Sequence, residues 1–130
     1  MTRPRQGPEA RTSKDILMPR NPADRLRAIC LALPDATEAP MRRGPTYRIA
    51  NKIFAMERPQ DDAVAVWCKA PPGSQVILVG ADPARFFVPP YVGPKGWIGI
   101  RLDGKVDWKE VTALIERSYR LIAPKRPRHN

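Results

Sequence analysis

The sequence predicts an α+β domain, and two observations support this. Around Asn51-Lys52, apolar and polar residues alternate on both sides of a two-residue turn, which is typical of a β-hairpin. Near each end of the chain, apolar residues recur with the spacing of an amphipathic helix. A chain of 130 residues with 42% hydrophobic content is sufficient for one core. We therefore expect one domain in which helices pack on a sheet.

The first helix is predicted at Pro22–Leu33. Asn21 is placed to cap it, Pro22 suits the first helical position, and Pro34 stops it. Its apolar stripe consists of Leu26, Ile29, Cys30 and Leu33. Residues 1–20 are rich in Pro, Gly and Arg, so we expect a disordered basic arm there, a single domain over 21–124 and a basic tail over 125–130.

A linker over Asp35–Met41 is expected to lead into the hairpin. With Asn51-Lys52 as its turn, Ala50 would pair with Ile53. The face toward the helices would then carry Tyr47, Ile49, Phe54 and Met56. Lysine is a poor second turn residue, so a shift of one residue in the register is the alternative, and it would exchange the faces of one strand.

The remaining elements follow from turn residues and periodicity. A third strand is predicted at Ala63–Ala70, with Val64, Val66 and Cys68 on one face and Ala65, Trp67 and Lys69 on the other. The β-branched residues of Gln75–Val79 favour a strand, although the preceding Pro-Pro-Gly-Ser also suits a helix start. Short strands are predicted at 86–88 and 96–102. Asp107 and Glu110 indicate the start of a final helix that ends before Pro124.

Four segments together resemble the MmcQ/YjbR-like family over about Leu26 to Lys125. They are Leu26-Arg-x-Ile-Cys-Leu-x-Leu-Pro34 with Glu38, Gly44-Pro-Thr-Tyr-Arg with Lys52-Ile-Phe-Ala, Phe86-Phe-Val-Pro-Pro-Tyr91-Val-Gly-x-Lys-Gly-Trp97, and Asp107-Trp with Ser118-Tyr-Arg-Leu-Ile-Ala-Pro-Lys125. The resemblance implies the order α-β(3)-α-β(2)-α, a CyaY-like fold with an antiparallel sheet covered on one side by helices. It also implies that Gln75–Val79 is helical, and DNA binding or regulation is the function suggested for such proteins.

The charge is strongly positive but concentrated at the ends of the chain. The net charge is +10; residues 1–22 hold five basic and two acidic residues, and residues 120–130 hold four basic and no acidic ones. Seven of the ten net charges therefore lie at the termini, which weakens the inference from overall charge to nucleic-acid binding. No apolar run is long enough for a signal peptide or a membrane span, so we expect a soluble cytoplasmic protein.

Catalytic and metal-binding signatures are weak. The sole histidine, His129, lies one residue from the end and offers no anchored base, so we expect no enzymatic activity. Cys30 and Cys68 are not in a CxxC pair and are expected to be buried free thiols. Asp61-Asp62 fits a turn, and Gly93, Gly96 and Gly99 lead into a strand rather than a helix. We therefore expect no metal and no cofactor.

One surface remains a candidate site. The sheet face away from the helices is predicted to combine cations with indoles, and the hairpin over Ala39–Met56 has four basic residues and no acidic one. The candidate contact residues are Arg42, Arg43, Arg48, Lys52, Trp67, Lys69, Tyr91, Lys95, Trp97 and Arg101. This surface could bind nucleic acid weakly, bind a small anionic ligand, or be a structural face or protein interface in which the tryptophans pack beneath Arg and Lys stems. A monomer or weak dimer is expected.

Overall fold

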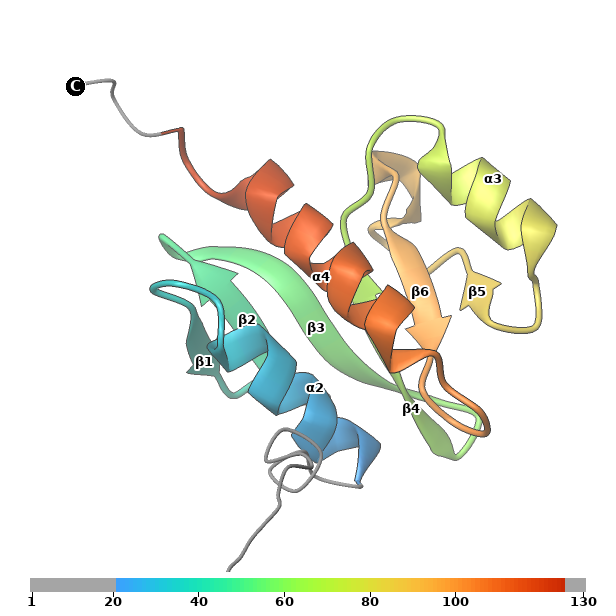
Figure 1. Cartoon of the computed structure of the whole chain (residues 1–130), viewed down its shortest axis with the longest axis horizontal. Coiled ribbons are helices and arrows are strands. Elements are labelled where there is room, and N and C mark those ends of the chain that lie inside the picture. The colour runs from blue at the N-terminus through green and yellow to red at the C-terminus, as the bar shows by residue number, and fades with distance from the viewer. Residues whose placement is uncertain (1–20, 126–130) are drawn as a thin grey trace, which may run out of the picture.

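The computed structural model describes residues 21–125 (Figure 1). The predictions of a disordered arm over 1–20 and of a basic tail beyond residue 125 lie outside the described residues. In chain order the elements are α2 Pro22–Leu31, β1 Thr37–Ala39, β2 Thr46–Ile49, β3 Lys52–Gln60, β4 Ala63–Cys68, α3 Ser74–Ala81, β5 Phe86–Phe87, the 3₁₀ turn η1 Gly93–Lys95, β6 Ile98–Arg101 and α4 Trp108–Ile122.

In the described part of the chain, six strands form one antiparallel sheet in the order β1-β2-β3-β4-β6-β5. Helices α2 and α4 cover one face of this sheet, and α3 lies beside β5 and β6 (Figure 1). The predicted α+β fold with helices on one side is therefore confirmed. We call the sheet face away from α2 and α4 the open face.

Both predicted helix caps are present. The Asn21 side chain accepts hydrogen bonds from the backbone N–H groups of Ala23, at 2.8 Å, and Asp24, at 3.2 Å. The Asp107 carboxylate accepts from the N–H of Glu110 at 3.1 Å. Each cap satisfies backbone donors that the first turn of a helix leaves unpaired. Helix α2 ends at Leu31, two residues before the predicted end.

The structure corrects the prediction for the linker at 35–41 and decides between strand and helix for Gln75–Val79. The expected linker contains the short strand β1, in which Glu38 pairs with Tyr47 of β2. Three residues of weak strand propensity carry no periodicity of their own, so only pairing with β2 defines this strand. Residues Ser74–Ala81 form α3, as the family resemblance implied and against their strand propensity. The start signal Pro-Pro-Gly-Ser was therefore more informative than the β-branched side chains.

The predicted hairpin register is wrong by one residue, and the alternative register is the one observed. Ile49 pairs with Lys52, so Ala50 and Asn51 form the turn, with φ of 52° and 67°. A tight hairpin requires left-handed backbone at both turn positions, which Asn51 adopts readily. The lysine that suits the turn poorly is thereby moved into the strand.

A β-bulge then partly restores the predicted faces. Tyr47 pairs with Ala55 but Arg48 with Ile53, so Phe54 is an extra residue on β3. Because of this bulge, Tyr47, Ile49 and Phe54 still face the helices, as predicted. Met56 does not: it lies on the open face with Trp67 and Trp97.

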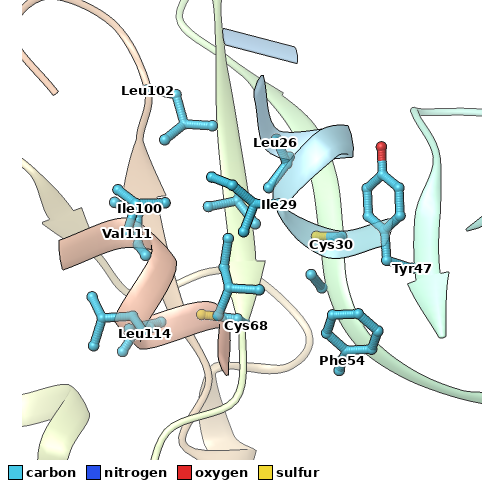
Figure 2. Close-up of a cluster of buried hydrophobic side chains, with 14 of the residues drawn as sticks. Leu26, Ile29, Cys30, Tyr47, Phe54, Cys68, Ile100, Leu102, Val111 and Leu114 are labelled. Carbon is cyan, nitrogen blue, oxygen red and sulfur yellow. The ribbon is translucent and has the colours of Figure 1, made fainter. Parts of the chain in front are cut away.

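The main core lies between the sheet and the two covering helices. Figure 2 shows Leu26, Ile29 and Cys30 of α2 directed toward the strands, with Tyr47 and Phe54 beside them. On the same face of the sheet, next to α2, Val111 and Leu114 of α4 approach Ile100 and Cys68. The Phe54 ring meets Tyr119 edge-on, with ring centres 5.4 Å apart. These contacts join both helices to the central strands and hold the sheet in one position.

The two cysteines are buried free thiols, as predicted. Burial raises the pKa of Cys68 from 9.0 to about 12, and burial, with smaller contributions from Cys68 and Glu38, raises the pKa of Cys30. In the unfolded chain both thiols would ionise near pH 9. Their contribution to stability is therefore complete below pH 9 and is lost as the pH rises above it.

We expect the free energy of unfolding to fall by about 1.4 kcal/mol per thiol between pH 7 and pH 10. Urea unfolding at the two pH values measures this difference. A variant with both Cys30→Ala and Cys68→Ala is the control, because it should lose less stability over the same interval. An equal loss in parent and variant would show that other groups cause the pH dependence.

Candidate nucleic-acid interface

The two predicted tryptophans lie under other side chains on the open face. Trp67 and Trp97 are only 7% and 6% exposed, and with Met56 they form a second, smaller apolar cluster. The guanidinium of Arg58 lies 5.7 Å from the centre of the Trp67 ring. Trp67 thus packs beneath an arginine, and Trp97 is buried in the same cluster, which agrees with the structural interpretation of this face. In this arrangement neither ring is accessible for a base to stack on.

Arginines are placed on the open face by the strand register. Arg58 of β3 lies opposite Ala65 of β4, which lies opposite Arg101 of β6, so all three side chains leave the same face. Arg48 of β2 leaves this face too, opposite Ile53. Its Nε donates to Thr46 Oγ1 at 3.2 Å. Arg101 stacks on Phe87, 4.9 Å from the ring centre.

Two more arginines extend this group from the loop before β2. Arg42 and Arg43 are exposed in the turn that precedes Gly44. Arg58 donates to the Gly44 carbonyl at 3.3 Å, which ties the loop to β3. Burial is the main cause that lowers the pKa of Arg58, and the positive charge of Arg43 lowers it further. Arg43 and Arg58 therefore repel each other.

Among the described residues no carboxylate forms an ion pair with this group, although the negative charge of Glu57 offsets part of the lowering of the Arg58 pKa. Over residues 21–125, the ion pairs are Arg27 with Glu38, and Arg85 with both Asp82 and Glu110. Both pairings lie outside the open-face group. We define the arginine surface as the five cations Arg42, Arg43, Arg48, Arg58 and Arg101, of which Arg58 is only 8% exposed and donates to the carbonyls of Gly44 and Glu57. Within the described chain, no ion pair involves any of them.

The other predicted contact residues lie elsewhere. Lys52 pairs with Ile49, whose side chain faces the helices, so it leaves the sheet on the opposite side from Arg48. Lys69 follows β4, and its backbone N–H is bonded to Ser118. Tyr91 is 82% exposed, and Lys95 is exposed in η1, both in the loop before β6. The structure groups four of the ten predicted residues in the arginine surface and buries Trp67 and Trp97 on the same face, whereas Lys52 leaves the sheet on the other side.

Sequence reasoning missed Arg58. Alternation along the predicted hairpin placed Met56 toward the helices, and Arg58, two residues on, would share that face. With the observed register, Met56 and Arg58 both move to the open face. The alternation of β4 could have indicated this, because Ala65 and Trp67 were correctly assigned to the open face and Arg58 and Met56 are their partners.

Other site types have little support within the described residues. Over 21–125, no three His, Cys, Asp or Glu side chains converge on a point where a metal ion could bind. Asp61 and Asp62 form the turn between β3 and β4, with φ of 47° and 64°. The helices of this part of the chain are also too short or too polar to cross a membrane.

These features define the class of protein: an α+β domain with helices on one side of an antiparallel sheet and an arginine-rich face on the other. The model of the YjbR family matches residues 31–121, so the chain belongs to the YjbR family. A solved structure, that of the Deinococcus radiodurans protein DR2400 with its DUF419 domain, is similar with a TM-score of 0.68. It is 23% identical, and the match covers 80% of this chain and 82% of that one. A search of curated proteins found no match.

Proposed function

We propose that this protein is a non-enzymatic nucleic-acid-binding protein that contacts phosphates through the arginine surface. The observation that carries the proposal is the grouping of Arg42, Arg43, Arg48, Arg58 and Arg101, none of which forms an ion pair over residues 21–125. Arg58 and Arg101 also cover Trp67 and Phe87, but cations of one sign close together repel one another, and bound phosphates would offset that repulsion.

Phosphate is the anion that suits this geometry. A guanidinium offers two parallel N–H donors to phosphate oxygens and remains charged at any physiological pH. A phosphate near the loop would also relieve the repulsion between Arg43 and Arg58. Since the indoles of Trp67 and Trp97 are covered, the proposal requires backbone contacts and no base stacking. Binding should therefore be weak, largely independent of sequence and sensitive to salt.

The test compares two triple variants of the full chain on duplex DNA over a range of salt concentrations. The first removes Arg42, Arg43 and Arg48 by substitution with Ala. The control variant replaces the exposed residues Lys52, Lys105 and Arg120 by Ala. It loses the same three positive charges, but at positions outside the arginine surface. Both retain the basic termini, so the contribution of the termini cancels in the comparison.

We expect the first variant to bind more weakly and to flatten the slope of log affinity against log salt by about 2.7 units, at roughly 0.9 per lost phosphate contact. The control variant should keep a slope close to that of the parent. If both variants change the slope equally, the attraction is general and the arginine surface is not a site. Failure of the parent to bind at low salt would also refute the proposal.

A further inference from the structure

On the side of the sheet that the helices cover, opposite the arginine surface, a groove of about 810 Å³ separates α2 from α4. The apolar part of its lining is Ala28, Ile29, Ala32, Leu33, Trp108 and Ala113. Both helices begin at the same end of the domain and run side by side over the sheet (Figure 1). Because the alanine side chains on both helices are short, they leave the space between the helices unfilled and its apolar walls open. A volume of this size is in the range of small-molecule sites.

The two ends of the groove differ in charge. At the end where both helices begin, Arg25 and Lys109 line the groove, whereas Glu116 lies about two turns further along α4. The N-termini of the helices add positive potential at the Arg25 end. Of the acids near this end, Asp107 caps α4 and Glu110 pairs with Arg85, whereas Asp24 in the first turn of α2 is exposed to solvent. An elongated ligand would therefore place a negative group at this end.

Arg25 is positioned to receive that group. Its guanidinium carbon lies 4.7 Å from the centre of the Trp108 ring, so the cation spans from α2 to α4. Its Nε is buried and has no hydrogen-bond partner among the described residues, and over 21–125 no ion pair involves Arg25. A buried donor without a partner is unfavourable. A carboxylate in the groove, beside the part of the guanidinium that is not covered, would supply the opposite charge.

We propose that this groove binds a single-chain anionic amphiphile, specifically a medium-chain carboxylate. The carboxylate contacts Arg25, and the alkyl chain lies along the alanines toward Glu116. From Trp108 to Glu116 the helix advances about 12 Å. An extended alkyl chain advances about 1.3 Å per carbon, given C–C bonds of roughly 1.5 Å. Decanoate therefore matches the groove in length as well as in charge. This site is separate from the arginine surface, and either can exist without the other.

The experiment titrates the full chain with decanoate, kept below the concentration at which it forms micelles, and measures heat and tryptophan emission. Trp108 lines the groove, whereas Trp67 and Trp97 are covered on the far side of the sheet, so emission reports on the proposed site. Butyrate and decanol serve as comparison ligands, because the first lacks most of the chain and the second lacks the charge. Each buried methylene should raise affinity by up to about fourfold.

Two variants test the two halves of the site. Arg25→Gln should lower decanoate affinity at least tenfold with little effect on decanol, and Ala113→Phe should lower both by filling the groove. Arg120→Gln removes a charge from an exposed position of α4 outside the groove and should bind like the parent. Thermal melts confirm that each variant is folded. Equal binding of butyrate and decanoate, or unchanged affinity in both groove variants, would overturn the proposal.

Discussion

Replacing Ser118 by alanine is expected to lower the free energy of unfolding by about 2–6 kcal/mol. This is the sum for two buried backbone groups left without partners, at ~1–3 kcal/mol each. Ser118 is fully buried on α4. Its hydroxyl donates to the carbonyl of Phe54 at 2.7 Å and accepts from the backbone N–H of Lys69 at 2.9 Å. Phe54 is the extra residue of the β-bulge, so its carbonyl lies where the ladder between β2 and β3 is irregular.

One hydroxyl therefore provides a hydrogen-bond partner for the Phe54 carbonyl at the bulge in β3 and for the Lys69 N–H just after β4. It thereby joins both strands to α4. Alanine keeps the helix and nearly the same volume, so packing is little changed and the loss reports on the two hydrogen bonds. Urea unfolding at pH 7 measures it, with the slope of the transition checked for constancy.

The matched control is Thr112→Ala on the same helix. Its hydroxyl donates to the carbonyl of Trp108, four residues earlier, at 2.7 Å, and that carbonyl already belongs to the helix. This variant should lose well under 1 kcal/mol, since such bonds within a helix contribute little. Equal losses at Ser118 and Thr112 would show that the bridge across the bulge has no special role.

Much of the fold could be predicted because its signals are local. The helix caps at Asn21 and Asp107, the faces of β4 and the short strand at Phe86 all follow from spacing within one element. Strand β1 could not be predicted, because its three residues are ordered by pairing with β2 rather than by their own pattern. The bulge at Phe54 could not be predicted either, since the partner of its carbonyl, Ser118, lies 64 residues away.

The candidate site was harder to predict than the fold because it depends on register. An error of one residue at the hairpin turn placed Met56 on the wrong face and concealed Arg58. Burial was the second difficulty. Tryptophans on the open face suggested stacking, yet Trp67 lies beneath Arg58 and both Trp67 and Trp97 are buried. Residue types on one face therefore indicate which chemistry is present, but not which groups are accessible.

Replacing Gly44 by alanine is expected to impair both the fold and the arginine surface. Gly44 has φ of 139°, which side chains rarely adopt, and a Cβ there would lie 2.5 Å from the carbonyl oxygen of Glu57. That oxygen belongs to the backbone of β3 and cannot rotate away, so the loop itself must move. The backbone strain alone is of order 1–3 kcal/mol. With the displaced loop we expect a total loss of about 2–4 kcal/mol.

The control for Gly44→Ala is Gly104→Ala, where φ is 68° and a Cβ would meet nothing within 4 Å. It carries the backbone strain without the clash, so its loss should be about 1–2 kcal/mol. A displaced loop also carries Arg42 and Arg43 away from Arg58, whose bond to the Gly44 carbonyl holds them close. If phosphates bind there, Gly44→Ala should flatten the salt dependence of DNA binding by up to about 1.8 units, at roughly 0.9 per contact, at a temperature where the variant is folded. Gly104→Ala should leave that slope unchanged, and an unchanged slope in both variants would mean that the position of this loop does not determine binding.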